Sequence, residues 1–456
     1  MIPIRNNMNL RQIFSVIVKI TWARKTILFI QGFMLTLLLM IAVSQEATAQ
    51  QQRFPMPEFD TGYTIPDTTT PEPRSESMEY VDLSVLLAVL ALTTWLVLKK
   101  RSRNWIFWLV VFSLIYFGFY RNGCICPIGA VQNLALSLFS DTYAISLTVL
   151  AFFAIPLLLA LFAGRIFCAA ACPLGAIQDL VIVKPIKLSP WLQKTLGLFP
   201  FIYLGFAILY AATGTDFIIC RYDPFVGIFR LGAEFHMIIL GISFLLIGMF
   251  VARPYCRFVC PYGALLNIGS RFSKYHLSIT PSECINCKLC KDSCPFDAID
   301  YPTEEKDVRV TKEDNRRFIW IAILLPLLIF IGGLTISGSY KLLSRAHPDV
   351  HLASLLVANP ELMQETGNLD IDTFMASGKT VDMLVAEATV IQKKFRTGGW
   401  YLGGFIGLVI GLTLLNQMVF RKRSIYEANR GDCYSCGRCM DYCPVGKPDH
   451  PYHKGS

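Results

Sequence analysis

Long apolar runs, separated by short polar segments, dominate the chain. Eight of them are long enough for a membrane helix, some only with tilt or with flanking polar residues. They lie at residues 27–43, 81–98, 105–120, 144–162, 195–213, 235–252, 318–337 and 399–420. The pattern predicts an all-α polytopic membrane bundle of about eight helices, the first of which could instead be a signal peptide.

Composition supports this assignment. The chain has 456 residues, of which 54% are hydrophobic and only 16% are charged. Soluble domains rarely combine so much apolar surface with so few charges, so a purely cytosolic enzyme is disfavoured. The residues outside the apolar runs suffice for loops and one small domain.

The formal net charge of +9 would by itself suggest nucleic-acid binding, but the distribution of the Lys and Arg residues along the chain gives another explanation. With the N-terminus in the cytoplasm, alternating segments that face the cytoplasm carry 31 of the 42 Lys and Arg residues. Those segments are 1–25, 99–104, 163–194, 253–317 and 421–456. This bias follows the positive-inside rule, so the basic balance indicates orientation in a membrane and needs no nucleic acid.

The apolar runs and the cysteine motifs together divide the chain into six segments. They are a signal peptide or first helix at 1–44, an extracytoplasmic disordered linker at 45–80, a membrane domain at 81–275, a first ferredoxin-like segment at 276–316, a helix pair at 317–420 with an outer loop at 338–396, and a second ferredoxin-like segment at 421–456.

The ends of two of these segments leave questions open. Arg24 and Lys25, the apolar run after them and Ala47-Thr48-Ala49 also describe a signal peptide with a small-residue cleavage site, so cleavage stays open. The outer loop has helix-like patterning around 350–358 and 381–395, without a recognisable chemistry.

Fifteen cysteines carry the chemistry, and eight of them form two runs of the form C-x2-C-x2-C-x3-C-P. The runs are Cys284-Ile-Asn-Cys287-Lys-Leu-Cys290-Lys-Asp-Ser-Cys294-Pro295 and Cys433-Tyr-Ser-Cys436-Gly-Arg-Cys439-Met-Asp-Tyr-Cys443-Pro444. Three thiolates on one tight loop can reach three irons of a cubane, whereas the fourth cysteine is aimed elsewhere. In two-cluster ferredoxins this fourth cysteine ligates the other cluster.

The spacing therefore predicts two 4Fe-4S clusters with crossed ligand sets. The first set is Cys284, Cys287, Cys290 and Cys443, and the second is Cys433, Cys436, Cys439 and Cys294. The helices at 318–337 and 399–420 would form an out-and-back pair that returns the second run to the side of the first, in a small split α+β module. Zinc knuckles are the alternative, but zinc sites usually pair two CxxC hooks or use His.

A second motif repeats at predicted membrane boundaries. Its two copies are Arg165-Ile-Phe-Cys168-Ala-Ala-Ala-Cys172-Pro173-Leu-Gly175-Ala and Arg253-Pro-Tyr-Cys256-Arg-Phe-Val-Cys260-Pro261-Tyr-Gly263-Ala. A C-x3-C spacing on a helix puts both sulfurs on one side, so the four thiols could hold an additional cluster or metal, with Arg165 and Arg253 offsetting thiolate charge. Redox-active thiols and close helix packing by small residues remain alternatives.

A weaker third copy, Cys124-Ile-Cys126-Pro127-Ile-Gly129-Ala, falls at the predicted outer face, where Cys220 also lies. These three thiols could form a disulfide with one left over, or bind a cluster or metal with a fourth ligand that the sequence does not identify. The sequence has no CxxCH, GxGxxG or P-loop motif, so covalent c-type haem, a bound dinucleotide and ATP drive are not expected.

The order of C-x3-C-P repeats between membrane helices, followed by two ferredoxin runs, resembles the membrane-bound polyferredoxins of the NosR and NapH type. The likeness spans about residues 80–456. It implies a multi-pass protein of the bacterial inner membrane, with the ferredoxin motifs in the cytoplasm and two 4Fe-4S clusters. It also implies electron flow across or along the membrane to an extracytoplasmic system of nitrous-oxide or nitrate respiration.

The chain also departs from that family. NosR proteins carry a large outer flavin-binding domain, whereas this chain has only the short 45–80 segment, so the resemblance does not extend to covalent FMN. NapH-like proteins usually have fewer helices.

We expect an iron–sulfur protein that moves electrons between a cytoplasmic or quinol donor and an outer redox partner, in contact with lipid and redox proteins. The alternatives are a maturation factor that supplies electrons for metal-cofactor assembly and a redox-sensing regulator.

Overall fold

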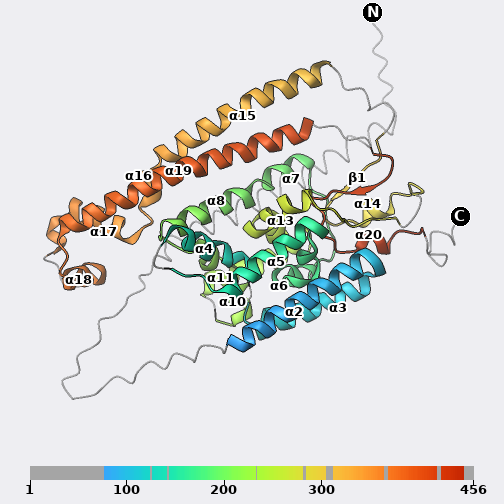
Figure 1. Cartoon of the computed structure of the whole chain (residues 1–456), viewed down its shortest axis with the longest axis horizontal. Coiled ribbons are helices and arrows are strands. Elements are labelled where there is room, and N and C mark those ends of the chain that lie inside the picture. The colour runs from blue at the N-terminus through green and yellow to red at the C-terminus, as the bar shows by residue number, and fades with distance from the viewer. Residues whose placement is uncertain are drawn as a thin grey trace, which may run out of the picture. The chain divides into compact units, whose positions relative to one another are not determined.

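A computed structural model shows a chain built mostly of helices (Figure 1). It describes residues 76–123, 126–140, 143–232, 234–280, 284–303, 312–363, 368–418 and 423–445. The chain divides into two compact units, one of residues 1–53 and 188–194 and the other of residues 54–187 and 195–456. All the cysteine sites lie in the second unit.

The helices of the described residues follow one another with short connections. Up to residue 248 they are α2 (Glu76–Trp95), η1 (Leu96–Lys100), α3 (Arg103–Ser113), η2 (Leu114–Tyr120), α4 (Pro127–Phe139), α5 (Leu147–Ala163), η3 (Phe167–Ala171), α6 (Pro173–Leu180), α7 (Pro190–Leu196), α8 (Phe199–Ala212), α9 (Ile218–Arg221), α10 (Val226–Arg230) and α11 (Phe235–Gly248). Beyond it they are α12 (Pro254–Phe258), α13 (Pro261–Arg271), α14 (Leu289–Ser293), α15 (Lys312–Gly338), α16 (Tyr340–Ser344), α17 (Pro348–Ala358), η5 (Pro360–Met363), α18 (Leu369–Ala376), α19 (Val381–Met418) and α20 (Arg438–Asp441).

Five stretches of helix among the described residues are long and apolar enough to cross a membrane. They are Ser77–Lys100, Arg103–Tyr120, Pro190–Ala212, Arg316–Gly338 and Val381–Gln417. Each contains or overlaps one of the apolar runs, so the prediction of a mostly helical chain with several membrane-capable helices is confirmed. The run at 27–43 lies outside the described residues.

Two of the expected crossings form shorter helices. The run at 144–162 gives α5, with 17 residues, and the run at 235–252 gives α11, with 14. At 1.5 Å per residue these helices span about 25 and 21 Å, less than the roughly 30 Å hydrocarbon core. Gly164 has a φ of 76° and ends α5.

The predicted out-and-back helix pair is present as α15 and α19, which lie side by side (Figure 1). Their contact depends on glycines four residues apart on α19. A Cβ at Gly403 would collide with the Gly332 carbonyl oxygen, and one at Gly407 with that of Leu328. Small residues at this spacing let two helix backbones approach closely inside a membrane.

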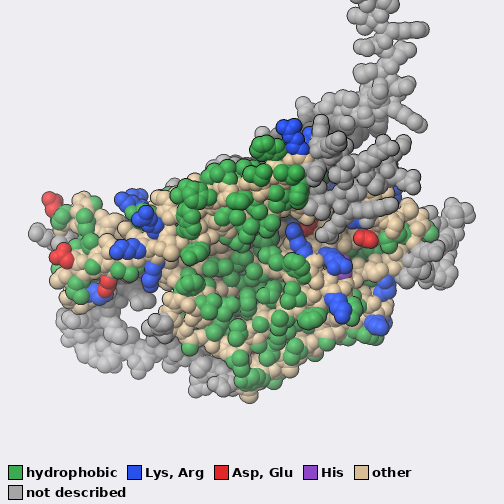
Figure 2. All heavy atoms as spheres, turned by 45° about the horizontal axis from the view of Figure 1, so that its top comes forward, with side chains coloured by type: hydrophobic (Ala, Val, Ile, Leu, Met, Phe, Trp, Pro, Cys, Tyr) green, Lys and Arg blue, Asp and Glu red, His purple; other side chains and the backbone are tan. Residues whose placement is uncertain are grey.

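Hydrophobic side chains form a broad band over one face of the molecule, with Lys and Arg gathered on both sides of it (Figure 2). The span Arg316–Gly338 on α15 is only 6% buried inside the molecule, although it is strongly apolar. Its exposed side chains include Trp320, Ile323 and Phe330. An apolar surface of this extent on a long helix suits contact with lipid.

The outer loop predicted at 338–396 is largely helical. It contains α16, α17 and α18, and α19 begins in it at Val381, so the patterning noted around 350–358 and 381–395 corresponds to helices. In the view of Figure 1 these helices lie at one end of the α15–α19 pair, and α14 and α20 lie towards the other. At the N-terminal side, α2 begins at Glu76, five residues before the predicted boundary at 81.

The two cysteine runs share one small sheet. Strand β1 (Ile299–Asp300) pairs antiparallel with β2 (Glu427–Ala428), with Ile299 opposite Ala428. The backbone N–H of Asn429 extends the pairing by donating to the Ala298 carbonyl at 2.8 Å. Two segments separated by more than 100 residues therefore form one module, as the crossed ligand sets require.

Candidate iron–sulfur sites

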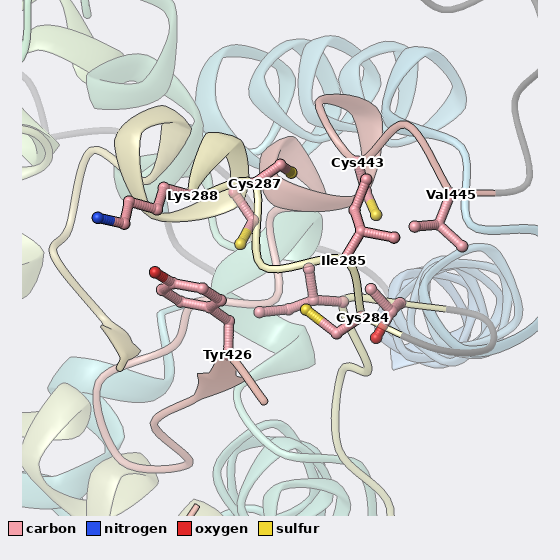
Figure 3. A pocket seen from close by; sticks show the side chains of 10 residues that line it. Cys284, Ile285, Cys287, Lys288, Tyr426, Cys443 and Val445 are labelled. Carbon is pink, nitrogen blue, oxygen red and sulfur yellow. The ribbon is translucent and has the colours of Figure 1, made fainter. Parts of the chain in front are cut away.

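The first cavity of the module is lined by cysteines from both runs. Cys284, Cys287, Cys290 and Cys443 border it, together with Tyr426 and other side chains (Figure 3). Three of these cysteines belong to the first run and the fourth to the second.

The second cavity repeats this composition with the runs exchanged. Its lining includes Cys433, Cys436 and Cys439 from the second run and Cys294 from the first. In the described part of the chain, no three His, Cys, Asp or Glu side chains are grouped as ligands of a single metal ion. The structure thus gathers around each cavity one of the two cysteine sets that the spacing had grouped.

Both runs adopt the same unusual backbone. Asn286 and Ser435, each just before the second cysteine, have φ values of 53° and 52°. Lys288 and Gly437, each just after it, have φ values of 66° and 77° and start the short helices α14 and α20. Left-handed conformation is costly for residues other than glycine unless the fold uses it. Here they wrap each loop around its cavity, and the Ser435 N–H donates to Cys433 Sγ at 3.4 Å.

Two cysteines of the module, Cys290 and Cys433, sit in an environment that disfavours a free thiolate. Burial raises the pKa of the Cys290 thiol to about 11 and that of Cys433 to about 12. Because metal ligation needs thiolates, loading of these sites would release protons. A cluster would provide the positive charge that the buried sulfurs otherwise lack.

The C-x3-C-P cysteines lie beside the module and are all buried. They are Cys168, Cys172, Cys256 and Cys260. The expectation that each pair sits on one continuous helix is wrong: Cys172 and Cys260 are extended and precede the prolines that open α6 and α13. Proline disfavours helical conformation in the residue before it, so the second cysteine of each pair caps a new helix.

The pairs also lie alongside membrane-capable helices. Cys168 is part of η3, which packs against α2 and α3, and α6 packs against η2 and α3. The first pair is therefore beside two candidate spans.

The arginine of each C-x3-C-P motif is buried and packs on the other copy of the motif. The Arg253 guanidinium lies 3.3 Å from where a Cβ would be on Gly175, and Arg165 lies 3.3 Å from the same point on Gly263. Each arginine precedes one cysteine pair and packs on the glycine of the other. Arg253 also donates to the Cys168 carbonyl. A side chain at either glycine would crowd the arginine that packs on it, which is a physical reason for the Gly in both motifs.

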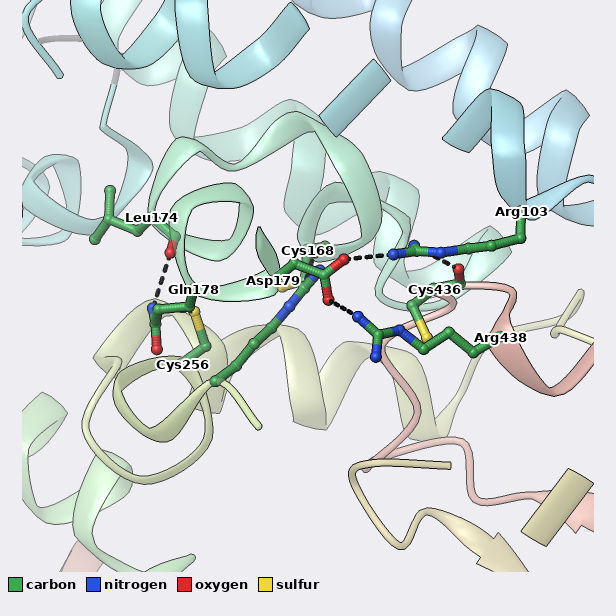
Figure 4. A network of polar contacts seen from close by, with 9 residues as sticks. Arg103, Cys168, Leu174, Gln178, Asp179, Cys256, Cys436 and Arg438 are labelled. Atoms are coloured by element: carbon green, nitrogen blue, oxygen red, sulfur yellow. Dashed lines mark hydrogen bonds and ion pairs between the residues drawn. The ribbon is translucent and has the colours of Figure 1, made fainter. Parts of the chain in front are cut away.

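One carboxylate, that of Asp179, connects the ferredoxin-like module with α3 and with the C-x3-C-P region, and we call this contact region the junction. Asp179 on α6 forms ion pairs with Arg103 at 2.6 Å, Arg253 at 3.2 Å and Arg438 at 3.2 Å (Figure 4). Burial would raise its pKa, but these three guanidiniums outweigh burial and hold the pKa well below its usual range. Arg103 also donates to the Cys436 carbonyl at 3.0 Å.

Aromatic contacts complete this junction. The Arg165 guanidinium lies 4.1 Å from the ring centroid of Tyr434, whose hydroxyl donates to the Cys256 carbonyl at 3.1 Å. The rings of Phe296 and Tyr434 are 4.7 Å apart. The second cysteine run is thus fixed directly to the C-x3-C-P region. Sequence reasoning missed Asp179, Tyr434 and Gln178, whose Nε2 donates to Cys256 Sγ at 3.2 Å.

The last three cysteines to place are Cys124 and Cys126 of the third motif copy and Cys220. Cys220 comes close to this copy, since its sulfur lies 3.0 Å from where a Cβ would be on Gly129. Neither Cys126 nor Cys220 is in a disulfide. Cys124 lies outside the described residues.

Comparison with known proteins gives matches over three of these cysteine motifs. A family model described as a 4Fe-4S binding domain matches residues 145–198 and 234–280, which hold both C-x3-C-P motifs. A second model with the same description matches residues 277–300, the first cysteine run. No solved structure matches the chain.

Three relatives illustrate the likeness. An uncharacterized protein of Methanocaldococcus jannaschii is 29% identical over 44% of this chain and 82% of its own length. The Escherichia coli protein YccM, whose name proposes an electron-transport role, is 28% identical over 37% of this chain and 52% of YccM. The regulatory protein NosR of Stutzerimonas stutzeri is 27% identical over 42% of this chain but only 28% of NosR. Together with the 4Fe-4S models and the membrane-capable helices, these relatives make the chain similar to NosR-like membrane proteins of the ferredoxin type.

Proposed function

We propose that the chain is an electron-transfer protein of the bacterial inner membrane that holds two 4Fe-4S clusters in its ferredoxin-like module. Cys284, Cys287, Cys290 and Cys443 would hold the first, and Cys433, Cys436, Cys439 and Cys294 the second. The observation that carries the proposal is the composition of the two cavities, each bordered by three cysteines of one run and one of the other. Bound there, the clusters would supply one-electron redox chemistry at low cost in reorganisation.

We also propose a third centre at Cys168, Cys172, Cys256 and Cys260. Support comes from their burial beside two arginines and from the 4Fe-4S model that matches both motifs. The buried guanidiniums of Arg165 and Arg253 would offset the charge of a centre ligated by four thiolates. Such a centre would lie between the module and the membrane helices.

The charge bias of the sequence supports a proposal for the two sides between which electrons pass. The Lys and Arg bias predicts that the module faces the cytoplasm, so electrons would pass between a cytoplasmic or quinol donor and an extracytoplasmic redox system. The junction residues Asp179, Arg103 and Tyr434 would keep the module docked on the membrane domain while partners come and go.

The test is iron and acid-labile sulfide per chain in anaerobically purified protein, with EPR spectra through a reductive titration. Two clusters predict about eight irons, and a third centre predicts more than about ten. Cys290→Ser should remove about four irons and stop reduction of an outer acceptor by membranes that contain the protein. Ser278→Ala, an exposed change outside both cavities, is the matched control. Undiminished transfer in Cys290→Ser would contradict the proposal.

A further inference from the structure

The third motif copy repeats the architecture of the first more closely than its cysteine spacing indicates. Cys126-Pro-Ile-Gly129-Ala-Val-Gln132 shares its Cys, Pro, Gly, Ala and Gln with Cys172-Pro-Leu-Gly175-Ala-Ile-Gln178, and the two remaining positions are aliphatic in both. In both copies the cysteine precedes a proline that opens a helix, α4 or α6. In both, the glycine N–H donates to the cysteine sulfur.

The two glutamines make the same contact with another segment. Gln178 Oε1 accepts the Tyr255 N–H at 3.1 Å, and Gln132 Oε1 accepts the Ile219 N–H at 2.9 Å. The next residue is a cysteine each time, Cys256 or Cys220. Cys220 therefore has the same position relative to the third copy as Cys256 has relative to the first: each follows the residue whose N–H the glutamine of that copy accepts.

The match continues beyond Cys220 and identifies a fourth position. Cys256-Arg-Phe-Val-Cys260-Pro261 aligns with Cys220-Arg-Tyr-Asp223-Pro224, one residue shorter, so Asp223 takes the place of Cys260 before the proline. Asp223 is only 4% exposed, and its Oδ1 accepts the N–H groups of Phe225 at 2.9 Å and Val226 at 3.2 Å. Cys260 Sγ likewise accepts the Gly263 N–H, at 3.3 Å.

Cys220 lies beside the third copy, and Gln132 is left with an open hydrogen bond. Cys220 Sγ lies beside Gly129, whose N–H donates to Cys126. Gln178 Nε2 donates to Cys256 Sγ, whereas Gln132 Nε2, with Gln132 0% exposed, has no partner among the described residues. A buried amide donor without an acceptor costs free energy unless a ligand supplies one.

We propose that Cys126, Cys220 and Asp223 hold a further iron–sulfur centre, towards which Gln132 donates a hydrogen bond. Thiolates suit iron–sulfur, zinc and copper(I) centres, and a carboxylate is a harder ligand in the place of one thiolate. The likeness to the two motif copies that the 4Fe-4S model matches favours iron–sulfur among these centres. The site is distinct from the sites of the proposed function and does not depend on them.

Mössbauer and EPR spectra of the full chain, purified anaerobically from iron-57 cultures, test the site. Cys220→Ala and Asp223→Ala should each lower iron by at least about two per chain, the content of the smallest common cluster, and leave the ferredoxin signals unchanged. Asp223→Cys should restore the iron and shift the EPR spectrum, because the ligand is changed and not removed. Asp216→Asn, which alters a surface ion pair with Arg221 in the same loop, is the control.

Unchanged iron and spectra in both Cys220→Ala and Asp223→Ala would overturn the proposal, as would zinc in place of iron. A second measurement needs no variant. Cys220 is on the exposed side of the site, so in the loaded protein it should resist alkylation until iron is chelated. Alkylation of the loaded protein, or a Cys126–Cys220 disulfide found by mass spectrometry, would also overturn it. Cys287→Ser should keep this centre, so loss of the ferredoxin clusters can be told apart from its failure.

Discussion

The two cysteine runs of the ferredoxin-like module have the same spacing and the same left-handed residues but lie in different surroundings. In the first run, Cys284 and Cys287 are half-exposed, and Lys288 beside them is exposed. In the second run all four cysteines are buried, and Arg438 leads from it into the ion pairs of Asp179. One sequence motif thus supports two different environments.

The difference suggests different tasks for the two cavities. A half-exposed site suits electron exchange with a partner that binds and leaves, whereas a buried site fixed to the membrane domain suits relay. Positive charge near a cluster stabilises the reduced form, so the second cavity should hold the centre of higher potential. Four predictions test this comparison.

The largest effect should come from removing one ligand of each set. Cys287→Ser and Cys436→Ser should each cost about four irons and abolish electron transfer to an outer acceptor. The reason is that serine is a poor iron ligand in place of thiolate. The two variants should lose different EPR signals. Loss of the same signal in both would mean that the two cavities are not separate sites.

Asp179→Asn should destabilise the junction by about 3–5 kcal/mol, the usual effect of leaving buried charges without their partner. Three arginines would then face one another around a neutral amide. Thermal unfolding in detergent measures the change. Asp292→Asn is the control in the first run, where the pair with Lys187 is exposed and should matter by less than about 1 kcal/mol. Equal effects would refute the contrast between the runs.

The cysteine grouping could be predicted from the sequence, whereas the surroundings of the two runs could not. Cysteine spacing is local, and because ferredoxin spacing fixes which sulfur faces which cavity, the grouping of Cys443 with the first run could be predicted across more than 140 residues. Asp179 offers no such signal, since a lone acid near the end of a short helix is usually solvated. Its role depends on arginines brought together by three other segments. Gln178 could have been found, because Gln132 repeats it at the same distance from a Cys-Pro pair.

Arg438→Leu should lower the potential of the second cluster by about 60 mV, which corresponds to about 1.4 kcal/mol for one electron. Leucine is the residue at the matching position of the first run, Leu289, so the substitution makes the two runs alike there. Lys288→Leu should shift the first cluster by less than about 20 mV, because water screens an exposed charge. EPR-monitored titration reads both values, and equal shifts would contradict the assignment of environments.

The smallest expected effect is the loss at low pH of the stability that ionised Asp179 contributes. Because the pKa of Asp179 lies well below its usual range in the folded protein, its ionised form stabilises the fold fully above the unfolded pKa of about 3.9. That contribution should be lost as the pH falls from there towards the folded pKa. The difference in thermal stability between the parent chain and Asp179→Asn should therefore stay constant from about pH 8 to 5 and shrink below about pH 4. Taking this difference cancels acid damage common to both proteins. A difference that shrinks already near pH 6 would mean that another group, and not Asp179, controls the docking of the second run.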